Sequence, residues 1–97
     1  MSEESETYVA ARELGRLLID AGFRVMTGGL CGVMEAASRG AHESACYREG
    51  DTIGLLPQGD PGEANPWVDI VLPTGMGHAR NSLVASGDAL VAVGGGA

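Results

Sequence analysis

Hydrophobic residues recur along this chain with two alternating spacings, one typical of helices and one typical of strands. After Ser5, a suitable N-cap, apolar side chains at helical spacing continue as far as Gly22, which favours a helix stop. This pattern predicts an amphipathic helix that covers a sheet. Its expected apolar stripe consists of Ala10, Leu14, Leu17, Leu18 and Ala21.

Short apolar runs bounded by glycine or proline predict strands at residues 23–27, 52–56, 67–72 and 88–93. Between them, helices are expected at residues 33–47 and 78–86. Alternating strands and helices indicate an α/β fold with a mostly parallel sheet and right-handed crossovers. No internal repeat or interdomain linker is evident, so residues 1–97 are read as one domain. The helix at 33–47 carries a stripe of small residues that lets it lie close to a neighbour: Val33, Ala37, Gly40, Ala41 and Ser44.

Charge and composition exclude several classes of function. The formal net charge is −7 and lysine is absent, which argues against nucleic acid as a partner because such binding depends on clustered basic residues. No apolar run is long enough to cross a bilayer, and the first residues are acidic where a signal peptide would be basic. We therefore expect a cytoplasmic protein with no membrane partner. Cys31 and Cys46 match no metal or disulfide spacing, so no metal site is predicted.

Three glycine-bearing turns follow predicted strands. Because the carboxyl ends of parallel strands meet at one edge of a sheet, these turns are expected to lie near one another, where backbone N–H groups can approach an anion. The first turn does not match the GxGxxG pattern, and a tight turn without a ligand explains it equally well. The residues predicted to bind a phosphate or another part of a ligand are Gly28, Gly29, Gly32, Thr74, Gly75, Gly94, Gly95 and Gly96.

Polar side chains near these turns extend the candidate site. A guanidinium at Arg80 is suited to bidentate binding of a phosphate or carboxylate, although an arginine in this position is more often simply solvated. Asn81 either binds the ligand or caps a turn. Glu35 faces the site or caps its own helix, and the capping role is the commoner one. His78 has no evident carboxylate partner and is interpreted as a surface residue.

Five segments in order resemble the successive blocks of the LOG-like, or SLOG, Rossmann-type family, and the molybdenum cofactor carrier-like branch is the most similar. The resemblance implies a three-layer doubly wound fold, usually dimeric or larger, that binds a phosphorylated nucleotide or pterin. In the phosphoribohydrolase branch an arginine followed by lysine serves catalysis; Arg80 matches the arginine, whereas Asn81 resembles the carrier-like branch instead. The segments are TGGLCGVMEA (27–36), TIGLLP (52–57), ANPWVDI (64–70), TGMGHARN (74–81) and AVGGG (92–96).

Compared with that family, the chain lacks the first strand and everything after the GGG of a GGGxGT loop, including the glutamate that serves hydrolysis. The missing strand would lie at the centre of the sheet, between the strands near residues 24–27 and 89–93. We therefore expect an incomplete Rossmann-like domain and a truncated or partial protein.

The leading functional expectation is a carrier that binds a phosphorylated nucleotide or pterin, with the molybdenum cofactor or a nucleotide as its ligand and without catalysis. One alternative is a nucleoside 5′-monophosphate phosphoribohydrolase, a cytokinin-activating N-glycosidase of the LOG type, in which Arg80 would be catalytic. The other alternative is a fragment without function. In the full-length protein we expect a homodimer or homotetramer whose partner is a small phosphorylated molecule.

Overall fold

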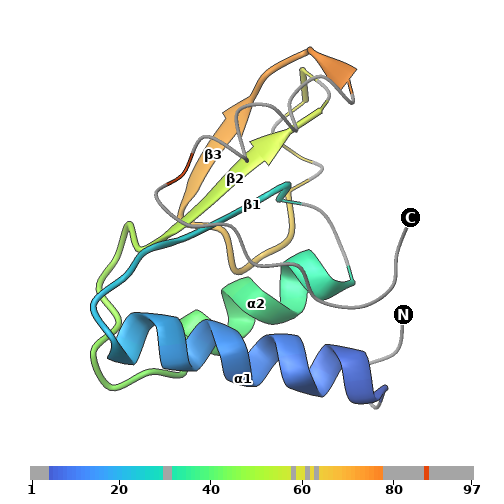
Figure 1. Ribbon diagram of the computed structural model, residues 1–97. Helices are drawn as coiled ribbons and strands as arrows, with labels where there is room; N and C mark the ends of the chain where they lie inside the picture. The colour runs from blue at the N-terminus through green and yellow to red at the C-terminus, as the bar shows by residue number, and fades with distance from the viewer. Residues whose placement is uncertain are drawn as a thin grey trace.

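The computed structural model describes residues 5–29, 32–57, 59–60, 62, 64–77 and 87. Their elements are helix α1 (Glu6–Asp20), strand β1 (Val25–Thr27), helix α2 (Val33–His42), strand β2 (Thr52–Leu56) and strand β3 (Ile70–Pro73) (Figure 1). The strands form a parallel sheet in the order β1-β2-β3. This arrangement confirms the predicted α/β class and parallel sheet.

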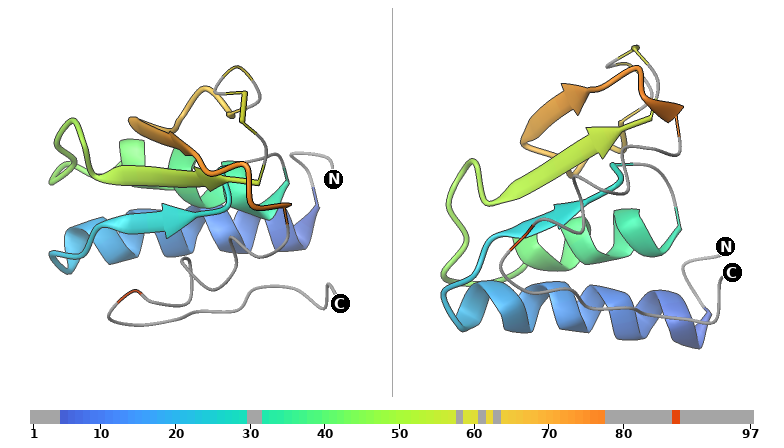
Figure 2. Two further views of the ribbon diagram at one scale, coloured as in Figure 1. Left: turned by 90° about the horizontal axis from the view of Figure 1, so that it is seen from above. Right: turned by 45° about the horizontal axis from the view of Figure 1, so that its top comes forward.

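Both helices lie on the same face of the sheet and run in the same direction (Figures 1 and 2). Tyr8 and Ala11 in the first half of α1 form a buried cluster with Ala36 near the start of α2. Farther along, Ile19 of α1 meets Ala41 of α2 and Val25 of β1. Because the helices return antiparallel to the strands, both begin at the end of the sheet where the strands finish.

The two helices approach through reciprocal glycines. A Cβ atom added to Gly15 of α1 would lie 2.0 Å from the carbonyl oxygen of Ala37, and one added to Gly40 of α2 would lie 1.7 Å from that of Arg12. Neither contact is possible for a real Cβ atom, so only glycine fits at these two positions. The prediction that small residues of the second helix allow close packing is confirmed.

The apolar stripe expected on α1 is only partly correct, because Leu18 packs against the core while three of the five residues face solvent. Leu17 is 49% exposed, and Ala10 and Ala21 also face solvent. Where the two helix backbones approach most closely, α1 places the small residue Gly15, and the larger Tyr8 and Ile19 pack on either side of it. The residues that α1 buries are Tyr8, Ala11, Gly15 and Ile19.

Three element boundaries also differ from expectation. Helix α2 ends at His42 rather than near residue 47, because Ser44 turns the chain by accepting a hydrogen bond from the Cys46 amide through its Oγ. Strand β1 begins at Val25 rather than at Phe23, which is 53% exposed. Strand β3 spans Ile70–Pro73 rather than 67–72, because the Trp67 carbonyl accepts side-chain hydrogen bonds outside the ladder.

Several expectations fall outside the described residues, namely the helix at 78–86, the strand at 88–93 and the third layer they would help to form. Within the described part of the chain, β1 pairs with β2 alone. The resemblance placed an additional strand on that open side of β1. No helix among the described residues has the length and apolar character needed to cross a membrane.

Candidate functional site

The turn that leaves β1 depends on glycine for its shape. Gly29 has a φ of +77° and Gly32 a φ of +76°, values that residues with a side chain rarely adopt. A Cβ on Gly29 would also lie 2.7 Å from a methyl group of Leu56, and a Cβ on Gly54 would lie 2.9 Å from the Gly29 Cα. Glycine thus lets the turn pass directly over the neighbouring strand β2.

Helix α2 begins immediately after this turn and leaves its first amide groups available. Its N-cap is Gly32, which has no side chain to cap it, and the first hydrogen bond of the helix runs from the Ala36 amide to the Gly32 carbonyl at 3.0 Å. The amides of Val33, Met34 and Glu35 therefore have no partner inside the helix. Amides in this position, together with the helix dipole, favour an anion. Glu35 lies in this first turn, where the same dipole stabilises a carboxylate.

The turn after β3 is attached to the end of β2. Thr74 donates to the Leu56 carbonyl from its amide at 3.0 Å and from its hydroxyl at 2.6 Å, and the Gly77 amide donates to the Pro57 carbonyl at 2.8 Å. Gly75 has a φ of +66°. Because neighbouring strands are about 4.8 Å apart, the turns after β1 and β3 lie roughly 10 Å from each other across the end of β2.

Asn65 connects the first turn to the loop before β3. It is 5% exposed, and it donates to the Gly29 carbonyl from its amide at 2.9 Å and from its side-chain nitrogen at 3.2 Å. Its side-chain oxygen accepts from the Trp67 amide at 3.0 Å. The sequence analysis included this asparagine in the family segment at 64–70 and did not assign it to the site. The Asn-Pro pair that precedes a strand was the available signal, since asparagine commonly organises such turns.

The described part of the candidate site thus comprises the two turns that carry Gly28, Gly29, Gly32, Thr74 and Gly75. Gly28 and Gly29 are buried, whereas Gly75 is exposed. The other predicted site residues, Arg80, Asn81, Gly94, Gly95 and Gly96, lie outside the described residues, as do Cys31 and His78.

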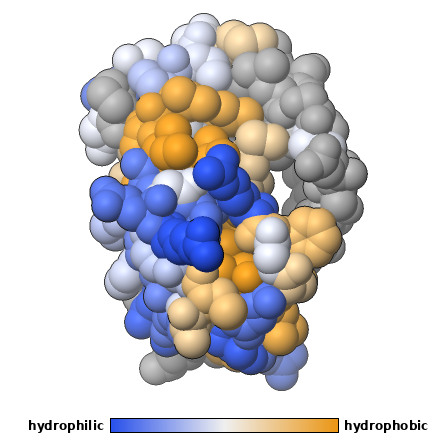
Figure 3. Space-filling model, turned by 90° about the vertical axis from the view of Figure 1, so that its left-hand side faces the viewer, coloured by the Kyte–Doolittle hydropathy of each residue, from blue (hydrophilic) through white to orange (hydrophobic). Residues whose placement is uncertain are grey.

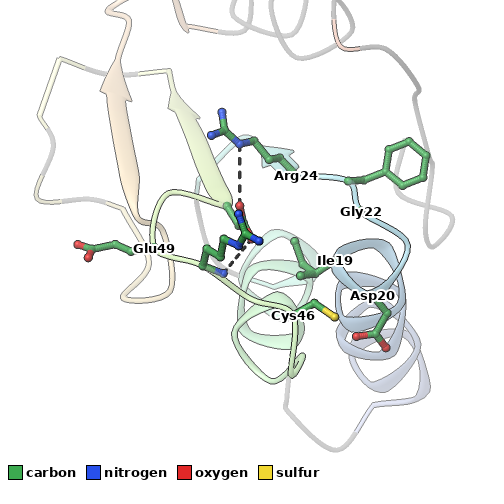
Figure 4. A pocket seen from close by; sticks show the side chains of 9 residues that line it. Ile19, Asp20, Gly22, Arg24, Cys46 and Glu49 are labelled. Carbon is green, nitrogen blue, oxygen red and sulfur yellow. Dashed lines mark hydrogen bonds and ion pairs between the residues drawn. The ribbon is translucent and has the colours of Figure 1, made fainter.

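The opposite end of the sheet carries an open hollow of about 450 Å³ where the strands begin. A hydrophilic band crosses this side of the molecule (Figure 3). Arg24 points across the hollow toward Asp51, with 3.9 Å between Nε and Oδ1, while Glu49 points away from it (Figure 4). Three carboxylates and two guanidinium groups line the hollow, so its charge does not favour a phosphate. Ligands of doubly wound sheets bind at the other end, which we take as the candidate site.

A polar cluster joins α2 to β3 at the end of the sheet where the strands begin, on the side of the hollow. Tyr47 donates to both oxygens of Asp69 at 2.7 Å, and the Gly50 amide donates to Oδ2 at 3.0 Å. Nε2 of His42 donates to the Trp67 carbonyl at 2.7 Å and lies 3.2 Å from Asp69 Oδ1. These bonds occupy the carboxylate, so the cluster serves as a structural link rather than as a reactive centre.

The same contacts perturb two pKa values in the cluster. Burial raises the pKa of Asp69, but the hydrogen bonds from Tyr47 and from the Gly50 amide outweigh burial and hold that pKa below its ordinary value. Burial, followed by the hydrogen bond to Asp69, raises the pKa of the Tyr47 hydroxyl well above its usual range.

Comparison with known proteins identifies the family. The model of the SLOG cluster4 family matches residues 1–97, and the chain belongs to this family. A protein of Archaeoglobus fulgidus without an assigned function is 40% identical over 94 residues, which cover 96% of this chain and 59% of that protein.

Solved structures with the same arrangement include two proteins named for the molybdenum cofactor. The molybdenum cofactor binding protein of Rippkaea orientalis is similar with a TM-score of 0.75 and 39% identity over 87% of this chain and 51% of that one. The molybdenum cofactor carrier protein of Chlamydomonas reinhardtii gives a TM-score of 0.68 with 37% identity, over 87% of this chain and 50% of that one. The chain spans about half the length of these two proteins. The predicted SLOG membership and the likeness to cofactor carriers are confirmed.

Proposed function

We propose that this chain forms the ligand-binding part of a carrier that holds the molybdenum cofactor, a phosphorylated pterin, without chemically changing it. The observation that carries the proposal is the glycine turn between β1 and α2, with positive φ at Gly29 and Gly32 and a first turn of α2 that no N-cap side chain caps. Such a turn receives a phosphate on backbone donors alone. The names of the two similar solved proteins support the choice of ligand.

The phosphate would sit at the start of α2, and the rest of the ligand would extend across the end of β2 toward Thr74 and Gly75. Arg80, Asn81 and the glycines at 94–96 would complete the site. In the full-length protein we propose a cytoplasmic homodimer or homotetramer. Light scattering coupled to gel filtration measures the number of subunits.

A carboxylate placed at the start of α2 tests the position of the phosphate. Met34 lies in the first turn and is only half-buried, so Met34→Glu adds a negative charge that the helix dipole tolerates but that repels a bound phosphate. Anaerobic calorimetry on the intact protein is expected to show molybdenum cofactor binding that weakens roughly tenfold in Met34→Glu, which corresponds to about 1.4 kcal/mol. The neutral control Met34→Gln is expected to bind like the wild type.

Two results contradict this function. The carrier function is wrong if the intact wild-type protein binds no molybdenum cofactor in this titration. Release of free adenine from AMP favours instead the phosphoribohydrolase considered above.

A further inference from the structure

Tyr8 occupies an unusual position between the two helix starts. It lies in the first turn of α1, where its amide donates to the N-cap oxygen of Ser5 at 3.1 Å. Its side chain is 1% exposed and belongs to the buried cluster with Ala11 and Ala36, against which Val33 packs. A large side chain with a polar end is therefore enclosed beside the first turn of α2.

The hydroxyl of Tyr8 has no hydrogen-bond partner in the described part of the chain. Leaving a buried hydroxyl unpaired costs about 1–3 kcal/mol, and buried polar atoms are nearly always paired in proteins. Tyr47 illustrates the usual situation, because its hydroxyl donates to Asp69 at 2.7 Å. The Oγ of Ser38 also lacks a partner in the described part of the chain. A serine in a helix can rotate and donate to the backbone carbonyl four residues earlier, whereas a tyrosine hydroxyl cannot reach that carbonyl.

The place of Tyr8 in the fold brings it next to the proposed site. Tyr8 lies in the first turn of α1 and packs beside Val33 in the first turn of α2, at the end of the sheet where both helices begin and the strands finish (Figure 1). The amides of Val33, Met34 and Glu35, which have no partner inside α2, lie at that end. Two helix starts side by side make this region favourable for negative charge.

We propose that the Tyr8 hydroxyl is a ligand-binding group that donates a hydrogen bond to an anionic oxygen of the bound molecule. The proposal rests on the proposed function and assigns to the site a side-chain donor besides its backbone amides. A phosphate monoester oxygen is the matching acceptor, because it carries several lone pairs and is negatively charged. The hydroxyl that lacks a partner in the described part of the chain is thus explained as a donor to the ligand.

The test compares two tyrosine-to-phenylalanine variants of the intact protein. Tyr8→Phe removes the unpaired hydroxyl, and the matched control Tyr47→Phe removes a paired hydroxyl at the opposite end of the sheet. Calorimetry with AMP and with anaerobically prepared molybdenum cofactor gives the affinities, and thermal denaturation without ligand gives the stabilities. For the probe that wild type binds, Tyr8→Phe is expected to weaken affinity roughly tenfold, the effect of one hydrogen bond to a charged group.

Stability separates a ligand-binding hydroxyl from one with a structural role. Without ligand, Tyr8→Phe is expected to raise Tm by about 4 °C because an unpaired buried group is removed, whereas Tyr47→Phe lowers Tm and keeps wild-type affinity. Wild-type affinity in Tyr8→Phe, or a lower Tm, overturns the assignment of Tyr8 and leaves the carrier function in place. If wild type binds neither AMP nor the molybdenum cofactor, both the assignment of Tyr8 and the carrier function are overturned.

Discussion

Replacing Gly40 by alanine tests the helix contact on which the fold depends. The new Cβ would lie 1.7 Å from the Arg12 carbonyl oxygen and 2.5 Å from its carbonyl carbon, whereas ordinary contacts begin near 3.4 Å. The obstructing atoms belong to the backbone, so no side-chain rotation relieves the contact. The helices must instead separate by roughly 1.5 Å and open the cluster that contains Tyr8, Ala11 and Ala36.

The size of the effect follows from two opposing contributions. Overpacking of this kind costs about 3 kcal/mol, at the upper end of the usual range because the backbone cannot move aside locally. Alanine is better than glycine in a helix by about 1 kcal/mol. The free energy of unfolding is therefore expected to fall by about 2 kcal/mol, which lowers the Tm of the intact protein by about 4–8 °C.

Urea denaturation of the intact protein, followed by circular dichroism, measures this change. Gly59→Ala is a matched control, because a Cβ at Gly59 meets nothing within 4 Å and its φ is not positive, so its stability should remain near wild type. In the double variant Gly15→Ala/Gly40→Ala the losses should be less than additive, since one separation of the helices relieves both contacts. Wild-type stability in Gly40→Ala would show that the helices need not separate to admit the methyl group. Strictly additive losses in the double variant would show that the two glycine contacts are independent.

Two further predictions concern buried polar links. Asn65→Ala removes the side-chain bond to Gly29 and leaves the Trp67 amide unpaired, so urea denaturation should give an unfolding free energy lower by about 2–3 kcal/mol. Asp69→Asn weakens the cluster around Tyr47 and lowers stability at pH 7. The folded-state pKa of Asp69 lies below the ordinary 3.8, so the stability it contributes is present above that pH and is lost as pH falls through the folded-state value. Between pH 6 and 3 the variant should therefore lose less stability than wild type in urea titrations.

One outcome for each of these two variants would contradict the prediction. An Asn65→Ala protein as stable as wild type would show that the Gly29 turn holds its shape without the asparagine. Equal acid sensitivity of Asp69→Asn and wild type would show that other carboxylates set the response to pH.

Most of the fold could be predicted because its elements rest on local patterns. Ser5 accepts the capping hydrogen bond from Tyr8, and the strand predicted at 52–56 is found at the same residues. The face of α1 could not be predicted from hydrophobicity, because close approach at Gly15 selects small residues over Leu17. That choice depends on a partner helix that is distant in the sequence.

In the candidate site too, some features could be predicted from the local sequence and others depend on contacts between distant residues. The position of Gly29 and Gly32 directly after a predicted strand indicates a glycine turn, and both have a positive φ in the structure. The contribution of Asn65 depends on a loop that returns 36 residues later to the first turn, and no local pattern reveals that contact. The unpaired hydroxyl of Tyr8 is likewise visible only once its neighbours are in place.

We propose that a phosphorylated ligand binds where the strands end. The most direct measurement is a titration of the intact, isotope-labelled protein with molybdenum cofactor, followed by the amide chemical shifts in two-dimensional NMR spectra. The largest shifts are expected at Gly32, Val33 and Met34, with little change at Arg48 and Asp51. Shifts concentrated around Arg48 and Asp51, or absent throughout, would contradict this proposal.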